Sequence, residues 1–241
     1  MRTKAIVIKK QNTNEYDQLV TCYTEEFGKL TAIAKSILKK SSLQAMHLDV
    51  LNMVEFDLVA GRALPIIASA HSDNVYSAIK KSIKLTAVAS FFADLVDKII
   101  FDNEKDPAMW DLLNHTLQAI NDAGENKVLN VMRNAQAKFL NVSGYSPQTS
   151  HCALCLTQVT SDSHIDHEWA LNFDLGGLIC RNCHLQTNRG FLLRSEDLKI
   201  LKNGQSDSSH IGKSSLDIIF EGITGRKLNS LQFVYQARIK S

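Results

Sequence analysis

The first seventy or so residues alternate short apolar runs with turn-forming residues, which is typical of a small β-domain. In the longest run, Val54, Phe56 and Leu58 fall on one face while Glu55 and Asp57 fall on the other, the period of two of a half-buried strand. Strands are expected at residues 5–8, 19–24, 30–34, 48–58 and 64–70. Five strands in about seventy residues predict a small closed barrel of the OB-fold type, with an SH3-like barrel or a small sandwich as alternatives.

The apolar period changes after residue 72 from two to three or four, which predicts helices. A first helix is expected over residues 75–99, capped by Ser72 or Asp73. A second is expected to begin where Asp106 precedes Pro107 and to end at Gly124, because proline suits the first helical position and glycine follows helix ends. A third is expected over residues 127–142, and further helices are expected to start at Ser195 and Ser214 and to pack on the central bundle.

The predicted fold class is therefore multidomain α+β. Residues 1–72 are expected to form the barrel domain and residues 73–241 an all-α domain. The segment from about residue 150 to 190 is expected to be an insert in the helical domain, because helical periodicity resumes after it.

That insert carries two cysteine pairs, each with two residues between its members. The four cysteines are Cys152, Cys155, Cys180 and Cys183. Two such knuckles supply four sulfur ligands in the tetrahedral arrangement of a structural Zn²⁺ ion, so the spacing predicts a zinc site with no open coordination position. A redox dithiol pair and buried, unreactive thiols are the alternatives, and the fifth cysteine, Cys22, is expected to fill the barrel core.

Net charge and the expected cellular compartment exclude few classes of function. The net charge is +2, but residues 1–40 hold eight basic and four acidic side chains, which makes this part +4 and the remainder −2. No apolar stretch approaches the length of a membrane span or opens the chain as a signal segment. A cytosolic protein with a basic N-terminal end is expected, and disulfides are rare in that compartment.

Several segments, in their order along the chain, resemble the RecO family of bacterial DNA-repair proteins. These are residues 14–21 (NEYDQLVT), 24–30 (TEEFGKL), 32–35 (AIAK), 144–147 (GYSP), 174–177 (DLGG) and 225–230 (GRKLNS). The resemblance implies an N-terminal OB-fold, a helical domain and a four-cysteine zinc site. It also implies a non-enzymatic recombination mediator in the cytoplasm, at the nucleoid, that binds single- and double-stranded DNA and anneals complementary strands. Its implied partners are RecR, the single-stranded-DNA-binding protein and, functionally, RecA.

Lysines around the predicted barrel are the candidates for DNA contact, because ammonium groups that meet phosphates release counterions and bind any sequence. The candidates are Lys9, Lys10, Lys29, Lys35, Lys39 and Lys40. The first two are expected to end the first strand, Lys29 to lie on a turn, and the last three to follow the third strand. Tyr16 suits either base stacking or core packing, and core packing is the expected role.

Two alternatives belong to other functional classes. The cysteine pairs together with His167 and His184 resemble the layout of an HNH nuclease, in which a histidine acts as general base. Only twelve residues separate His167 from Cys180, which is too short for the hairpin that such a site needs. Surface or zinc-supporting roles are therefore expected for His164, His167 and His184. A zinc-bearing scaffold that binds only protein is the other alternative.

Overall fold

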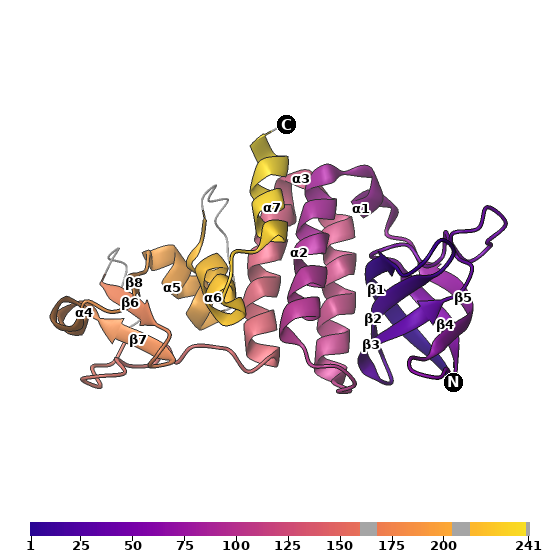
Figure 1. Ribbon diagram of the computed structural model, residues 1–241. Coiled ribbons are helices and arrows are strands. Elements are labelled where there is room, and N and C mark those ends of the chain that lie inside the picture. Colours follow the sequence, from indigo (N-terminus) through magenta and orange to yellow (C-terminus); the bar gives the residue numbers. More distant parts are fainter. Residues whose placement is uncertain (160–167, 204–212, 240–241) are drawn as a thin grey trace. The chain divides into compact units, whose positions relative to one another are not determined.

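The computed structural model describes residues 1–159, 168–203 and 213–239 (Figure 1). Residue contacts divide the chain into two compact units, residues 1–128 with 229–241 (unit 1) and residues 129–228 (unit 2). Because the chain returns to unit 1 at Asn229, unit 2 is an insertion within the sequence of unit 1. The domain boundary that the sequence predicts at residue 72, between the barrel and the helices, lies inside unit 1. It stays a prediction.

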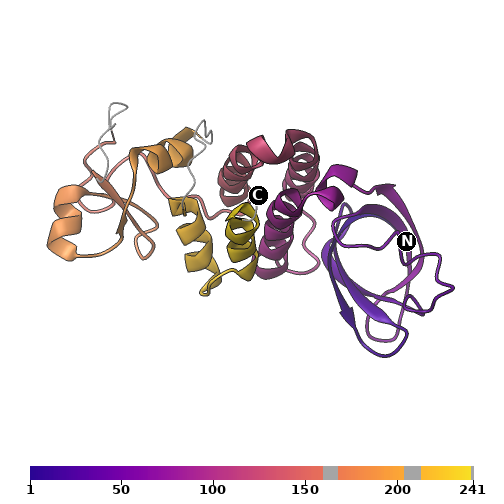
Figure 2. The same ribbon diagram turned by 90° about the horizontal axis from the view of Figure 1, so that it is seen from above.

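Unit 1 begins with a closed barrel of five strands, which Figure 2 shows as a ring. The strands are β1 (Arg2–Asn12), β2 (Gln18–Thr24), β3 (Gly28–Ala34), β4 (Met53–Val59) and β5 (Ile66–Asn74). Their order around the barrel is β1-β2-β3-β5-β4, and only the β3–β5 pair is parallel. This order and the helices that follow confirm the predicted OB-fold barrel with a helical region after it.

The long first strand closes the barrel because a register shift between Val7 and Lys9 bends it. Its beginning pairs with β4 and most of its length pairs with β2, both antiparallel. The inward side chains form one apolar core, in which Cys22 is fully buried as expected. β1 continues to Asn12. The sequence-based expectation that Lys9 and Lys10 end the first strand is therefore wrong.

The expected strand over residues 48–58 begins five residues later than the apolar pattern suggests. Leu51 has a left-handed backbone with φ 70°, which interrupts an extended chain. The N–H of Leu51 donates to the carbonyl of Val7 at 2.8 Å, and the N–H of Asn52 donates to Asp49 at 3.1 Å. The buried Leu48 therefore lies in a loop that packs on the core, and not in a strand.

The first helical segment is divided, and the predicted caps are wrong. Ser72 and Asp73 belong to β5, and Tyr76 is left-handed before the short helix α1 (Ser77–Lys81). The long helix α2 (Ile83–Ile99) starts at Ser82, whose hydroxyl accepts a hydrogen bond from the N–H of Leu85. The strand therefore extends into the region that the period change assigned to helix.

The other helix signals correspond to the structure more closely. Helix α3 (Pro107–Val142) starts where Asp106 Oδ1 accepts from the N–H groups of Ala108 and Met109 at 2.9 and 3.1 Å. Its interior is broken at Gly124, with φ 66° and ψ 172°, so the predicted second and third helices are its two halves. In unit 1, α7 (Asn229–Ile239) lies beside α2, where Ser230 Oγ donates to Asp94 Oδ2 at 2.5 Å.

Unit 2 contains a three-stranded sheet and short helices. The sheet has the order β7-β6-β8, from β6 (Trp169–Asn172), β7 (Gly177–Cys180) and β8 (Phe191–Leu192). The helices are α4 (Arg181–Thr187), α5 (Ser195–Asn203) and α6 (Ser215–Thr224). The polar sequence Asn-Gly-Gln-Ser-Asp-Ser-Ser at residues 203–209 predicts a loop, but this segment lies almost wholly outside the described residues. In the described part of the chain, no helix is both long and apolar enough to cross a membrane.

A buried ion pair joins the end of α3 to α6 within unit 2. Arg133 Nη1 lies 2.6 Å from Asp217 Oδ1, and both side chains are almost fully buried. Gln136 Nε2 donates to the same carboxylate oxygen at 2.9 Å, and the N–H of Ser214 donates to the other at 2.9 Å. The guanidinium and the two N–H donors therefore compensate the charge of the buried Asp217 carboxylate within unit 2, as a buried charge requires.

Candidate functional site

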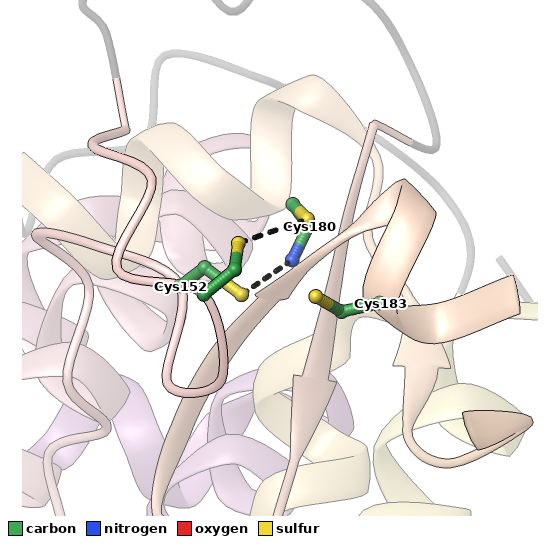
Figure 3. A group of neighbouring side chains, drawn as sticks. Cys152, Cys180 and Cys183 are labelled. Carbon is green, nitrogen blue, oxygen red and sulfur yellow. Dashed lines mark hydrogen bonds between the residues drawn. The ribbon is translucent and has the colours of Figure 1, made fainter. Parts of the chain in front are cut away.

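The four predicted cysteines come together in unit 2. Their sulfur atoms all lie within 4.8 Å of one another, and Cys155 Sγ is 3.7 Å from Cys180 Sγ. Four sulfurs around one tetrahedral ion, each about 2.3 Å from it, stand about 3.8 Å apart. Figure 3 shows Cys152, Cys180 and Cys183 with their sulfur atoms turned toward one another. The donor set and its spacing therefore fit a metal ion.

The backbone holds both knuckles in this arrangement. In the first, the N–H of Leu156 donates to the carbonyl of Cys152 at 3.0 Å, and Leu156 itself is left-handed with φ 61°. The N–H of Ala153 donates to the carbonyl of Leu178 at 2.7 Å, which attaches this knuckle to β7. Cys180 ends β7, and its N–H donates to Cys152 Sγ at 3.3 Å. The site is therefore formed by main-chain contacts between segments about thirty residues apart in sequence.

The thiols influence one another's ionisation. Hydrogen bonds from the hydroxyl and the N–H of Thr157 lower the pKa of Cys155 to about 6. A hydrogen bond with Cys180, together with burial, raises the pKa of Cys183 to about 12. Thiolates gathered this closely repel one another, and a cation at their centre favours the thiolate, which is the form that binds metal. The four cysteines could therefore hold a metal ion, with each sulfur as one ligand.

The histidines of the nuclease alternative do not join this cluster in the described residues. His184 lies in α4, where its Nδ1 donates to the carbonyl of Arg189 at 2.7 Å. The His184 ring is thus hydrogen-bonded to the backbone. Among the described residues, only the four cysteines gather closely enough to hold a metal ion. His164 and His167 lie outside the described residues.

Three of the six candidate lysines are engaged in ion pairs within unit 1. Lys9 Nζ lies 3.1 Å from Asp97, and Lys10 Nζ lies 3.3 Å from Asp49. Lys29 is only 8% exposed, in contrast to the turn position expected for it. Its amine lies 3.1 Å from an Asp102 carboxylate oxygen and donates to the Asp97 carbonyl at 2.9 Å.

The burial of Lys29 results from a close approach of two backbone segments at its neighbour Gly28. Gly28 has φ +64°, and a Cβ built there would stand 1.9 Å from the carbonyl oxygen of Glu104. The glycine therefore lets the segment around residue 104 pack against the turn between β2 and β3, and this segment covers Lys29. The N–H of Asn103 donates to the Lys29 carbonyl at 2.7 Å, which fixes the contact.

The other three lysines lie together in the segment after β3 and are exposed. In the described part of the chain, Lys35, Lys39 and Lys40 form no ion pair. Lys39 Nζ stands 5.2 Å from the centre of the Tyr16 ring, within the range of a cation–π contact. Tyr16 is 50% exposed, so the expectation that it packs in the core is wrong. We call Tyr16, Lys35, Lys39 and Lys40 the barrel face.

Hydrogen bonds at the β1–β2 tip set the position of Tyr16. Asn14 Oδ1 accepts from the N–H groups of Tyr16 and Asp17, each at 2.8 Å. Asp17 Oδ1 in turn accepts from the N–H of Ser36 at 2.6 Å, which joins the tip to the segment after β3. The bond from Ser36, together with one that Asn14 Nδ2 donates to Asp17 Oδ2 at 3.0 Å, lowers the pKa of Asp17, and the nearby Lys35 and Lys39 add to the effect. The sequence did not lead us to predict that Asn14 and Asp17 form this turn, although an asparagine three positions before an aspartate is a turn signal.

Comparisons with known proteins agree with the geometry of both units. Residues 1–75 match the family model described as "Recombination protein O N terminal". Residues 80–210 match the model described as "Recombination protein O C terminal". The DNA repair protein RecO of Dehalococcoides mccartyi strain CBDB1 is 27% identical over 210 residues, covering 86% of this chain and 79% of the relative.

Two further relatives match almost the whole chain. The DNA repair protein RecO of Moorella thermoacetica is 24% identical over 242 residues, covering 100% of this chain and 88% of the relative. That of Syntrophus aciditrophicus is 27% identical over 250 residues, covering 96% and 93%. With family models matched in both parts of the chain, this protein belongs to the RecO family of DNA repair proteins.

Proposed function

We propose that this protein is a recombination mediator that binds single- and double-stranded DNA and anneals complementary strands. The observation that carries the proposal is the barrel face, where three exposed lysines without ion pairs in the described chain follow β3 and one of them, Lys39, stands over the ring of the exposed Tyr16. Cations that track phosphates, combined with an aromatic ring that bases can stack on, are the usual elements of a single-strand binder. Family membership supports the same function.

The face binds without reading sequence, which annealing of arbitrary strands requires. Ammonium groups of Lys35, Lys39 and Lys40 meet phosphate oxygens and displace condensed counterions. Tyr16 offers one face of its ring to a base, while the Asn14 and Asp17 hydrogen bonds hold the backbone of the β1–β2 tip that carries it. Lys9, Lys10 and Lys29 contribute less, because their amines already neutralise carboxylates.

We further propose that the four cysteines hold Zn²⁺ and that its role is structural. Four thiolates complete a tetrahedral zinc site and leave no position for substrate or water. The ion would join the first knuckle to β7 and α4, where Cys180 and Cys183 lie. On this proposal the protein is a binding protein and not an enzyme.

The proposed partners follow from the family. RecR would act together with this protein to help RecA replace the single-stranded-DNA-binding protein on gapped DNA. The proposed location is the cytoplasm, at the nucleoid, where these partners and their DNA substrate meet.

Strand annealing on coated DNA is the experiment that tests this function. Complementary oligonucleotides covered with the single-stranded-DNA-binding protein should anneal faster when this protein is added, and RecR should change RecA loading on the same DNA. A charge-reversed barrel face (Lys35→Glu, Lys39→Glu and Lys40→Glu) should lose the acceleration, whereas reversing Lys81, Lys127 and Lys227 should keep it. Annealing that is unaffected by the wild-type protein would contradict the proposal.

The enzyme question has its own test. Plasmid DNA incubated with the protein and Mg²⁺ should stay intact, because no catalytic step is proposed. Cleavage that disappears in a His167→Ala variant would show that the nuclease alternative is correct.

A further inference from the structure

The loop between β3 and β4 exposes large apolar side chains next to the barrel face. Leu38 is 41% exposed, Leu43 is 82% exposed and Met46 is 72% exposed, all within nine residues of one loop. Single exposed apolar residues are common and need no explanation. Three in one short loop are a feature that usually marks an interaction site.

This exposure does not result from a loosely attached loop. Ile37 and Leu48, on either side of the exposed residues, are buried in the barrel core. Gln44 Nε2 donates to the carbonyl of Ala68 in β5 at 3.0 Å. The side-chain amide of Asn52 donates to the carbonyl of Met46 at 3.2 Å. The loop is thus fixed at both ends and in its middle, and it presents Leu43 and Met46 outward in a defined position.

Backbone hydrogen bonds place these residues in continuity with the lysines and the tyrosine. The N–H of Leu38 donates to the carbonyl of Tyr16 at 3.0 Å. The N–H of Ser42 donates to the carbonyl of Lys39 at 2.9 Å, so Leu43 directly follows a turn that starts at Lys39. Cationic and exposed apolar side chains therefore follow one another along the same loop, the lysines first and Leu43 and Met46 after them.

That combination favours single-stranded DNA as the occupant. The lysines attract a negatively charged polymer. Their charge argues against an apolar partner that carries no negative charge. Unpaired bases present apolar faces, whereas a duplex hides them by stacking, and Leu and Met are among the side chains that pack against unstacked bases. Resting on the proposed DNA-binding function, we propose that Leu43 and Met46 contact the faces of unpaired bases while Lys35, Lys39 and Lys40 hold the phosphates.

The contact gives this loop a role in annealing that charge alone does not supply. Lysines bind single strands and duplexes alike, since both carry phosphates. Leu43 and Met46 bind only while the bases are unpaired. Pairing removes the base faces from the apolar side chains, so the annealed product is held less tightly than its separate strands.

The test compares two full-length variants on the same DNA probes. Leu43→Ala combined with Met46→Ala should weaken binding to a single-stranded oligonucleotide on the order of tenfold, because apolar contact area is lost. The dependence of that affinity on salt should stay unchanged, since no phosphate contact is removed. Binding to a duplex of the same length should not change. Ile83→Ala combined with Phe101→Ala, which truncates two other exposed apolar side chains of unit 1, is the matched control and should bind like wild type.

Other results separate this inference from the proposed function. If the charge-reversed barrel face loses affinity while the Leu43 and Met46 variant binds single strands normally, the base contact is wrong and the DNA-binding function stands. If both variants bind normally, neither the base contact nor the barrel face is correct. If the apolar variant binds both kinds of DNA normally but loses binding to purified RecR, the loop is a protein-docking surface and the inference is overturned.

Discussion

The barrel face and the metal segment (residues 148–159 and 168–193) differ in how their polar groups are used. The four cysteines turn toward one another and are held by backbone hydrogen bonds from neighbouring segments. Lys35, Lys39 and Lys40 project into solvent, and in the described chain they form no ion pair. Ligands that converge on one point can hold an ion that stabilises the fold, whereas exposed cations without ion pairs are available to an anionic ligand. The most conspicuous motif in the sequence is thus not the region to which we assign DNA binding.

The largest expected effect separates metal binding from DNA binding. Replacing Cys152 and Cys155 with serine should abolish the one metal ion expected per chain and unfold the metal segment, because zinc-finger peptides gain about 10–16 kcal/mol from their ion. Metal content by atomic emission and thermal unfolding measure the two losses. Single-strand affinity at the barrel face should survive.

The control for that experiment is the cysteine outside the cluster. Cys22→Ala should keep the metal, because its thiol is buried in the barrel core. A DNA affinity that disappears together with the metal would contradict the separation of the two sites.

The second effect concerns the stability of unit 2 alone. Asp217→Ala leaves Arg133 buried without its carboxylate, which should lower the free energy of unfolding by about 3–5 kcal/mol. Chemical denaturation followed by circular dichroism measures the change. Glu221→Ala removes a surface ion pair with Lys213 and should cost about 0–1 kcal/mol. Equal losses in the two variants would show that the buried pair is not a major contributor.

The third effect distinguishes a structural lysine from a DNA-binding lysine. Lys29→Met removes the donor to Asp97 and the partner of Asp102, so it should destabilise the protein by about 1–2 kcal/mol. The salt dependence of single-strand binding, measured where the variant is fully folded, should match wild type. A flatter salt dependence in this variant would place Lys29 among the phosphate contacts.

The smallest effect concerns the hydrogen bonds that position Tyr16. Bonds from Ser36 and Asn14 lower the pKa of Asp17 below its ordinary value of 3.8. Their stabilising contribution is therefore complete above about pH 4 and is lost as the pH falls through the lowered pKa of the folded protein. Carbon NMR of the carboxyl group should show a midpoint below 3.8, and Asn14→Ala should raise it. A midpoint at or above 3.8 in wild type would mean that these bonds are not formed in solution.

Sequence patterns predicted the structure correctly where neighbouring residues along the chain determine it. The alternation at residues 54–58 gave the correct strand faces, and the Asp106–Pro107 start and the Gly124 break were recognised from cap chemistry. The spacing of the cysteines likewise predicted their convergence, because two tight knuckles need little else than a hairpin between them.

Other features depended on contacts that no local pattern reveals. Leu48 and Val50 continue the alternation of Val54, Phe56 and Leu58, but the chain between them and β4 is not extended, since Leu51 adopts a left-handed backbone and its N–H bonds to the carbonyl of Val7. Lys29 is covered by a segment about seventy-five residues later in the chain, and Arg133 finds its partner 84 residues away. Tyr16 is exposed because an asparagine-centred turn places it at a hairpin tip.

The most direct test of the account is the salt dependence of single-strand binding by the charge-reversed barrel face. With Lys35, Lys39 and Lys40 changed to glutamate, the affinity should fall at least about tenfold, and the slope of log affinity against log salt should flatten by about 2. The variant with Lys81, Lys127 and Lys227 reversed carries the same change in net charge and should keep the wild-type slope. An unchanged slope in the first variant, or equal flattening in both, would contradict the assignment of DNA binding to the barrel face.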